Sequence, residues 1–335
     1  MADNVTEKKP DALPPLLMQS SPHIASPVNS VHLMRNVLVA LAPVTIFSVV
    51  IFGVPALLNI IVAVVAAVAG ESLFRRAINR PVRVKDLSAI VTGVMLALVI
   101  PPSMPLWMTA LGSLFSVIVA KEFFGGLGAN TFNPALAGRA FLLMSFPAAM
   151  TTWHQPQDGF ATALTDATST ASSLNPESLN PEASGEVASY LEMFLGFRAG
   201  SSGETSIMLI VAAFVFLLVT KTIDWRAPLS MLAAGFVMAF ILGNDPIQAI
   251  LSGGIVFGAV FMTTDYVSAP ITPLGKVIFG IGAGIITMLI RQFGTYPEGV
   301  CYSILIMNCA VPFLNKLLPR KYGFVPKKPG REVAK

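Results

Sequence analysis

The sequence predicts an all-α polytopic membrane protein, with about ten transmembrane helices arranged as two inverted five-helix repeats that contain broken helices. Three observations lead to this prediction. Apolar residues make up 54% of the chain and charged residues only 12%, whereas soluble domains typically carry about 25% charge. Apolar runs recur along the chain, and basic residues collect at alternate ends of these runs. Proline- and glycine-rich breaks interrupt the runs in both halves. A bilayer is the natural solvent for such a chain.

Residues 1–35 predict a cytoplasmic N-terminal tail. Residues 1–30 are polar and contain several prolines, without the basic start and apolar core of a cleavable signal peptide. The sequence pI of about 9.1 does not indicate a nucleic-acid partner, because the basic residues are spread over loops beside apolar spans. Only two cysteines are present, so no disulfide framework is implied.

The apolar runs predict ten spans, five in a first repeat (36–150) and five in a second (206–315). Several are shorter than the roughly 20 residues that a helix needs to cross a bilayer, as happens where helices are broken. The predicted spans are Val37–Phe52, Ala56–Leu73, Leu87–Ile100, Leu106–Ala120, Pro134–Met150, Ile207–Thr220, Pro228–Leu242, Ile247–Met262, Val277–Ile290 and Val300–Leu314.

The lysines and arginines orient these spans. With ten spans and a cytoplasmic N-terminus, all but Arg198 and Arg291 of the 22 basic residues fall in cytoplasmic segments, if Lys121 and Arg139 are counted there. Such a bias follows the positive-inside rule. It predicts that both termini are cytoplasmic, including a basic tail at 316–335, and that the loop 151–205 lies on the outer face.

The long polar loop contains the sequence Thr165-Asp166-Ala167-Thr168, which is similar to a flavin attachment site. Joining a flavin to the Thr168 hydroxyl through its phosphate would prevent the cofactor from diffusing away. An exposed loop is a suitable target for the transferase that makes such a bond. The four-residue pattern alone is more typical of a solvated loop, because short motifs match by chance.

The two halves contain similar interruptions. Proline-rich breaks occur at 101–105 and 269–273, and glycine-containing turns occur at 124–134 and 293–299. An odd number of spans per half would invert one half relative to the other, as in many transporters. The alternative is that glycine and proline are simply common in membrane helices.

The glycines of 125–128 could cradle a phosphate where a helix begins. However, no strand precedes them and the Lys-Ser/Thr pair of a phosphate-binding loop is missing, so packing of a broken helix is favoured. No metal site is predicted, because the histidines and cysteines lack ligand spacing.

Acidic residues near the spans are candidates for an ion path, because ionisable groups inside a membrane are usually functional. Ordinary positions at the membrane interface are an equally good interpretation. The acids concerned are Glu71, Glu122, Asp245, Asp265 and Glu298.

The chain resembles RnfD, a membrane component of the Rnf electron-transport complexes, in a family that also includes NqrB of the sodium-pumping NADH:quinone reductase. The resemblance extends from about Ser21 to Phe324 and is specific as a set of motifs. The motifs are Ser-Pro-His-Ile-Ala-Ser-Pro-Val (21–28), Gly125–Phe141 with Phe-Asn-Pro-Ala-Leu-Ala-Gly-Arg, Met-Thr-Thr-Asp-Tyr-Val-Ser-Ala-Pro (262–270) and Tyr-Pro-Glu-Gly (296–299).

The resemblance implies FMN esterified through its phosphate to a threonine, a non-covalent riboflavin in some relatives, and a fold like that of urea channels. The attachment motif of the family is of the type Asp-x-x-Ser/Thr-Gly-Ala-Thr. Thr165 and Ala167-Thr168 match it, whereas Asp166 replaces its glycine and Thr162 its leading acid. Thr168 is therefore the predicted attachment residue, and Thr170 and Thr165 are alternatives.

The family likeness predicts a component of an ion-translocating ferredoxin:NAD⁺ oxidoreductase in the bacterial inner membrane, which carries electrons through FMN. The implied partners are other membrane subunits, peripheral iron–sulfur and flavin subunits, and a flavin transferase for maturation. Asp265, Glu298 and Glu122 are the candidates for translocation of Na⁺ or H⁺. The chain lacks cluster ligands and a dinucleotide motif, so it is not expected to be a complete enzyme. The alternatives are an NqrB-like component of the quinone reductase, a urea-channel-like transporter without a cofactor, and a structural scaffold.

Overall fold

A computed structural model describes residues 29–82, 84–154, 169–170, 190–196, 200–294 and 299–316 of the chain. Within these ranges the elements are helices, apart from one pair of two-residue antiparallel strands, β1 (Trp153–His154) and β2 (Ser169–Thr170). In the described part of the chain, two helices are long and apolar enough to cross a membrane, α1 (Ser30–Ala77) and α12 (Pro273–Phe293). The prediction of an all-helical protein suited to a membrane is confirmed in this coarse form.

Helices in the first half follow the predicted spans closely. After α1 come η1 (Val84–Asp86), α2 (Ser88–Val99), α3 (Leu106–Val117), the π-helical turn η2 (Ile118–Glu122), α4 (Pro134–Ser145) and α5 (Pro147–Met150). Proline occupies the first position of α4 and α5, where its missing N–H costs nothing.

Helices in the second half begin after the long loop, which contributes α7 (Tyr190–Leu195). They are α8 (Ile207–Val219), α9 (Arg226–Ile241), α10 (Pro246–Leu251), α11 (Ile255–Phe257), the π-helical turn η4 (Gly258–Met262), α12 and α13 (Val300–Lys316).

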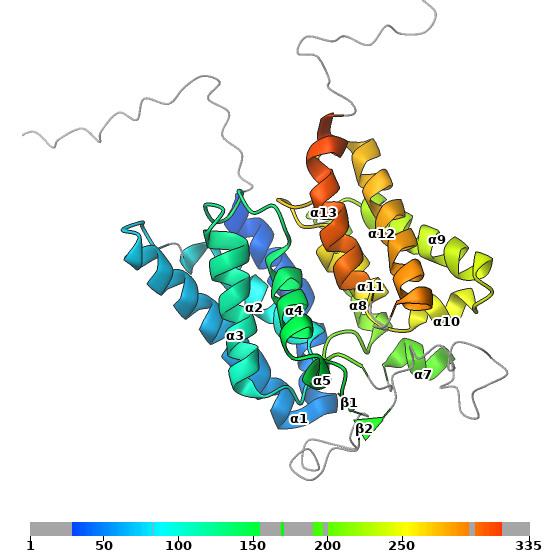
Figure 1. The fold of residues 1–335 in the computed structure, drawn as a ribbon, viewed down its shortest axis with the longest axis horizontal. Helices are drawn as coiled ribbons and strands as arrows, with labels where there is room; N and C mark the ends of the chain where they lie inside the picture. Colours follow the sequence, from blue (N-terminus) through cyan, green and yellow to red (C-terminus); the bar gives the residue numbers. More distant parts are fainter. Residues whose placement is uncertain are drawn as a thin grey trace, which may run out of the picture.

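The first two predicted spans are two arms of one bent element, α1. The arms meet at Gly53, whose φ of 67° and ψ of −147° are not helical. Glycine adopts this conformation at little steric cost, and Pro55 follows it at the start of the second arm. Figure 1 shows the resulting V, with both ends of α1 at one end of the molecule.

Two predicted spans are interrupted within their length. The fifth divides between α4 and α5 at Phe146, directly before Pro147. The eighth, predicted as Ile247–Met262, divides between α10 and α11 at 252–254. The π-helical turns η2 and η4 lie at the ends of the fourth and eighth predicted spans. In a repeat of five plus five spans, the fourth span would correspond to the ninth. The two turns are therefore not at matching positions of such a repeat.

The helices form two groups that meet along the middle of the molecule (Figure 1). α1 packs against α2 and α3 in the first group, and α12 packs against α9 and α13 in the second. Contacts of α1 with α8 and of α4 with α13 join the groups. The start of α1 and the end of α13 lie at one end of the molecule, whereas α7 and the β1–β2 pair lie at the other (Figure 1).

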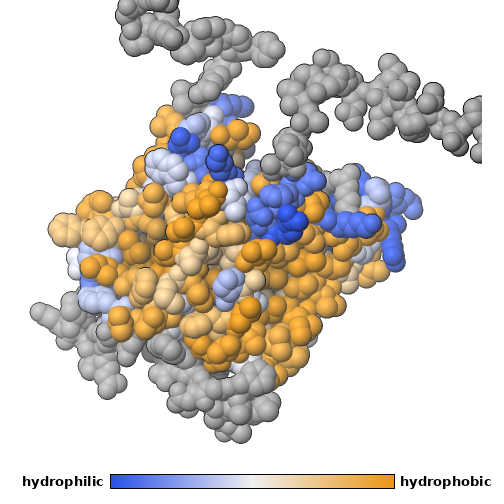
Figure 2. Space-filling view, turned by 180° about the vertical axis from the view of Figure 1, so that it is seen from behind, coloured by the Kyte–Doolittle hydropathy of each residue, from blue (hydrophilic) through white to orange (hydrophobic). Residues whose placement is uncertain are grey.

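The outer surface is strongly apolar. Large hydrophobic side chains are exposed on α1, α8 and α9, including Ile46 (65% exposed), Val215 (52%) and Phe240 (72%). Figure 2 shows apolar surface across the body of the molecule, with hydrophilic residues gathered towards one end. Because soluble monomers rarely expose apolar patches of this extent, the surface suits contact with lipid or partner subunits.

The end of the long loop lies inside the protein, which the sequence did not predict. Ser201, Ser202, Glu204 and Thr205 are each at most 3% exposed. The backbone N–H of Gly203 donates to the Leu98 carbonyl oxygen at 2.7 Å, and that of Ser202 donates to the Ile100 carbonyl oxygen at 3.3 Å. This segment therefore satisfies carbonyl groups at the C-terminal end of α2, which would otherwise lack partners.

Candidate functional site

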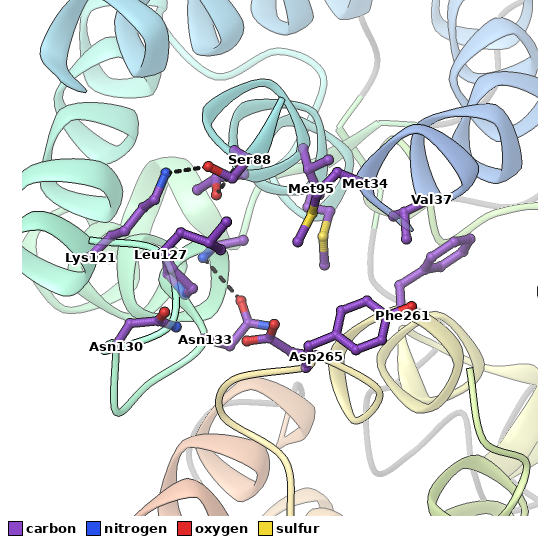
Figure 3. Close-up of a pocket in the computed structure, with 15 residues that line it drawn as sticks. Met34, Val37, Ser88, Met95, Lys121, Leu127, Asn130, Asn133, Phe261 and Asp265 are labelled. Atoms are coloured by element: carbon purple, nitrogen blue, oxygen red, sulfur yellow. Dashed lines mark hydrogen bonds between the residues drawn. The ribbon is translucent and has the colours of Figure 1, made fainter. Parts of the chain in front are cut away.

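A pocket lies between the two groups of helices, lined by residues from both halves of the chain (Figure 3). Its apolar wall includes Met34 and Val37 of α1, Met95 of α2 and Phe261 of η4. Apolar walls with a few convergent polar groups are typical of small-molecule and cofactor sites. We call this cavity the interface pocket.

The polar side chains of the interface pocket come from four elements: Ser88 and Thr92 from α2, Lys121 from η2, Asn130 and Asn133 from the loop before α4, and Asp265 and Tyr266 from the loop after η4. Figure 3 shows Lys121 and Ser88 on one side of the cavity and Asp265 across from them, next to Asn133. The pocket thus combines a cation, a carboxylate and amide groups on an apolar frame.

Asn133 is held in place by its role at the start of α4. Its side-chain oxygen accepts hydrogen bonds from the backbone N–H of Ala135 at 3.1 Å and of Leu136 at 3.4 Å. This is the usual capping arrangement, and Pro134 follows at the first helical position. With its side-chain amide turned to the orientation that satisfies both of its atoms, Asn308 of α13 donates to the Ser268 carbonyl oxygen at 3.1 Å and accepts from the Asn133 N–H at 3.2 Å. It therefore ties together the two loops that line the pocket.

Asp265 is fixed by a local hydrogen bond, which the Ser268 hydroxyl donates to its carboxylate at 2.6 Å. Burial raises the pKa of Asp265 above its ordinary value of 3.8, although this bond and backbone N–H groups act in the opposite direction. Partial burial, together with the charge of Asp265, also raises the pKa of the neighbouring Tyr266 to about 12. The Tyr266 hydroxyl donates to the Thr222 carbonyl oxygen, which anchors the loop to the turn after α8.

A network of buried charges extends from the pocket into the first group of helices. Lys121 Nζ donates to Glu71 Oε2 at 2.9 Å, Glu71 Oε1 lies 3.4 Å from Arg75 Nε, and Arg75 Nη2 donates to Glu122 Oε1 at 2.9 Å. All four side chains are at most 4% exposed. Buried charges persist only when they are paired, and here two cations balance two carboxylates.

The glycine-rich turn after η2 packs against this network. A side chain at Gly126 would collide with the guanidinium group of Arg75 and approach the Glu122 carboxylate. Gly126 has a φ of +93°, which favours glycine. This close packing at Gly126 favours the interpretation that the glycines of 125–128 pack a broken helix, and it does not favour a phosphate-binding site.

Lys121 and Arg139, two basic residues that were expected in cytoplasmic segments, are buried. Arg139 lies within α4, is 3% exposed, and its Nη1 lies 3.1 Å from Glu204 Oε1. Each cation is placed by a carboxylate that is distant in the sequence, so its charge is neutralised inside the protein. Both residues lie inside the protein, and their assignment to the cytoplasmic side of the membrane stays a prediction.

The predicted site residues occupy different regions. Thr168, Thr165 and Glu298 lie outside the described residues, and Thr170 pairs with Trp153 in the β1–β2 ladder. Asp265 lines the interface pocket, whereas Glu122 lines a separate, more open cavity beside Phe123 and Phe124. The structure therefore does not bring these two ion-path candidates together.

The remaining acidic candidate, Asp245, and the two cysteines lie away from the interface pocket. Asp245 accepts hydrogen bonds from the Ile247 N–H, at 2.9 Å, and from the Tyr190 hydroxyl, which marks it as the cap of α10. Cys301 is buried and Cys309 is exposed. Among the described residues, no group of three or more His, Cys, Asp or Glu side chains could hold a metal ion.

We did not predict Lys121, Asn130 and Asn133 as pocket residues, nor Arg75 as the centre of the charge network. The signal for Lys121 was a single lysine at the end of an otherwise apolar span, where an ionisable side chain is costly. The two asparagines were part of the quoted motif at 125–141, but their convergence with Asp265 depends on contact between the halves.

Comparison with known proteins gives a consistent result. Residues 17–323 match the NQR2, RnfD, RnfE family. The chain is 40% identical over 320 residues to the D-subunit of the proton-translocating ferredoxin:NAD(+) oxidoreductase complex of Clostridium ljungdahlii, covering 91% of this chain and 96% of the relative. It is also 40% identical over 312 residues to the D-subunit of the Na(+)-translocating ferredoxin:NAD(+) oxidoreductase complex of Acetobacterium woodii, covering 92% and 95%. A third relative, the D-subunit of the ion-translocating oxidoreductase complex of Escherichia fergusonii, is 36% identical over 342 residues, covering 91% and 97%.

Proposed function

The chain belongs to the NQR2, RnfD, RnfE family, and on this premise we propose that it carries electrons as the RnfD-type membrane component of an ion-translocating ferredoxin:NAD⁺ oxidoreductase. The observation that carries the proposal is 40% identity over at least 91% of the chain to two relatives named as components of such complexes. The names of these relatives differ in the translocated ion, a proton in one and Na⁺ in the other, and the proposal covers both.

We propose that FMN is attached covalently to Thr168, with Thr170 and Thr165 as alternatives. The match of Thr165 and Ala167-Thr168 to the attachment motif supports this assignment. A covalent link would keep the flavin on the protein through many turnovers, so the protein only has to position it.

The attachment is tested by fluorescence of the denatured protein on a gel, after co-production with a flavin transferase. We expect a fluorescent band for the wild type and for Thr170→Val and Thr165→Val, and none for Thr168→Val. Mass spectrometry of the peptide Thr151–Arg198 should show the added mass of FMN on Thr168. A colourless, correctly matured wild type would overturn the assignment and favour a transporter or a scaffold.

We further propose that the interface pocket holds the isoalloxazine ring of a non-covalent flavin, riboflavin. The apolar side chains of Met34, Val37 and Met95 suit the faces of a flat ring system. The amide groups of Asn130 and Asn133 and the charges of Lys121 and Asp265 suit the hydrogen-bonding edge of its pyrimidine ring. When bound, a flavin supplies one-electron transfer, and these residues would bind and orient it.

Substitution Val37→Trp tests the pocket by filling it. We expect this variant to release little or no riboflavin on denaturation while it retains covalent FMN. Val39→Trp is the matched control, because Val39 is 51% exposed on the same helix. Equal riboflavin release from both variants would contradict the assignment.

We propose that the chain is inserted with both termini in the cytoplasm, the 151–205 loop outside, and the two halves related as inverted five-helix repeats. The basic residues outside the buried pairs support the orientation. The start of α1 and the end of α13 at one end of the molecule support an even number of crossings (Figure 1). Asp265, Glu122 and Glu298 stay candidates for the ion path, with iron–sulfur and flavin subunits as electron partners.

A further inference from the structure

Lys121 is an unusual pocket-wall residue because its charge is almost completely removed from solvent. Its side chain is 2% exposed, and Nζ donates to Glu71 Oε2 at 2.9 Å and to Ser88 Oγ at 2.6 Å. Of the lysines and arginines that the structure describes, no other lines the interface pocket. In a region from which water is excluded, such a fixed charge acts on its surroundings more strongly than it would in water.

The carboxylate that pairs with Lys121 does not reach the pocket. Glu71 is fully buried behind Lys121 and also faces Arg75, which in turn contacts Glu122. None of these three residues lines the interface pocket. The pocket is therefore exposed to the ammonium end of the Lys121–Glu71 pair, whereas the negative end points into the first group of helices.

Ser88 restrains the direction of the ammonium group. The Ser88 hydroxyl accepts from Lys121 and donates to Asp86 Oδ1 at 2.8 Å, and the Ser88 N–H bonds the same oxygen at 3.0 Å. Figure 3 shows Lys121 extended along the pocket wall towards Ser88. With Glu71 and Ser88 as its two partners, Lys121 is fixed in position before any ligand binds.

We propose that Lys121 sets the redox potential of the flavin in the interface pocket, with Glu71 as the counter-charge that moderates its effect. This inference rests on the proposed riboflavin site. Reduction adds negative charge to the pyrimidine side of an isoalloxazine ring, and a fixed cation beside that side stabilises the reduced form. Lys121 would therefore raise the potential of a flavin that binds with this side towards its ammonium group (Figure 3).

A purely structural role makes a different prediction. If Lys121 only neutralised Glu71 and held η2 in place, removing either partner would disturb the site in the same way. If the charge itself acts on the flavin, removing the cation and removing its counter-charge must shift the potential in opposite directions. The sign of the shift therefore separates the two roles.

The test is a redox titration of the full-length protein followed by visible absorbance, with Thr168→Val in every sample to remove the signal of covalent FMN. Lys121→Met should lower the midpoint potential, and Glu71→Gln should raise it. We expect each to change the ratio of reduced to oxidised flavin at fixed potential by about tenfold, or about 30 mV for a two-electron couple.

Three further variants complete the test. Lys121→Arg keeps the charge and should keep the potential near that of the wild type. The double variant Lys121→Met with Glu71→Gln leaves no lone buried charge, and its potential should lie between those of the single variants. Lys85→Met removes an exposed cation of η1 that does not line the pocket and should leave the potential unchanged. Shifts of the same sign in Lys121→Met and Glu71→Gln, or none in either, would overturn the inference.

Failure of the underlying site is recognisable separately. Protein carrying Thr168→Val alone must release riboflavin on denaturation. If it releases none, the riboflavin assignment fails and the inference about Lys121 fails with it. If riboflavin is released but the potentials do not respond to charge, the site stands and only the role of Lys121 is wrong.

Discussion

Arg139 and Glu204 form a buried ion pair that joins a helix of the first half to the segment before the second half. Their side chains are only 3% and 4% exposed. Desolvation makes such a pair a weak source of net stability, but removing one partner leaves an uncompensated buried charge.

We expect Arg139→Met to lower the free energy of unfolding by about 3–5 kcal/mol, because Glu204 loses its cation. Adding Glu204→Gln should restore much of this loss. The measurement is equilibrium unfolding in mixed detergent micelles. Arg226→Met is the matched control: Arg226 pairs with Asp224 but is 37% exposed, so its loss should cost about 1 kcal/mol or less. Equal losses of unfolding free energy in Arg139→Met and Arg226→Met would contradict the expectation that the buried pair is more costly to break than the exposed one.

Asp224 gives the protein a defined pH dependence. Partial desolvation acts to raise its pKa, but hydrogen bonds and charges of Lys276 and Arg226 outweigh it and hold the pKa below its ordinary value of 3.8. The two cationic nitrogens lie 3.1 and 2.9 Å from its carboxylate. A carboxylate with a lowered folded-state pKa adds stability above its unfolded-state pKa, and that stability is lost as pH falls through the folded-state pKa.

Wild-type protein should therefore have a higher Tm than Asp224→Asn at neutral pH, and the difference should shrink as pH falls below about 3.8. Thermal melts of both proteins across the acidic range measure this difference. A gap in Tm that does not depend on pH would show that the negative charge of Asp224 is not the source of the difference.

Among the helices, the contact between α9 and α12 depends on glycines. A Cβ atom at Gly280 would meet the Ala227 carbonyl and Ser230, and one at Gly284 would meet the Met231 carbonyl oxygen. Small residues in this spacing let two helix backbones approach closely, as is common between membrane helices.

We expect Gly284→Ala and Gly280→Ala each to destabilise the fold by about 1–3 kcal/mol, because rigid backbone blocks the added methyl group. Gly282→Ala is the control on the same helix, since its Cβ would meet only the flexible Met307 side chain of α13. Unfolding in detergent should rank Gly282→Ala closest to the wild type. The packing argument would be wrong if all three substitutions cost the same.

Across the molecule as a whole, the β1–β2 pair and α7 lie at the end opposite to the start of α1 and the end of α13 (Figure 1). The proposed orientation places the 151–205 loop outside the cell and residues 316–335 inside. Together these features predict which added cysteines an impermeant reagent can reach.

In protein lacking its native exposed thiol through Cys309→Ser, we expect Ser172→Cys to react with an impermeant maleimide added to intact cells. Lys321→Cys should react only after the membrane is opened. The reverse pattern would invert the proposed topology and place the flavin loop in the cytoplasm.

Local sequence was enough to specify the helical membrane class and most helix boundaries, because hydropathy and proline at helix starts are local properties. The predicted limits of α2, α8 and α13 agree with the structure to within two residues. The sequence also indicated Asp265 through its motif. The gap between the first two predicted spans, at 53–55, contains the kink at Gly53. Local pattern missed the break at 252–254, since glycines that bend a helix and glycines that pack look alike in sequence.

Which charges meet, in contrast, depends on how the helices pack. Lys121 pairs with Glu71, 50 positions away, and Arg139 pairs with Glu204, 65 positions away. Both cations were counted among cytoplasmic segments, and neither ion pair was predicted, because hydropathy scores each residue without its partner. The interface pocket likewise exists only where loops of the two halves converge through Asn308. Burying a charge is tolerated only when its partner is brought beside it, and that condition is met by the packing of helices distant in sequence.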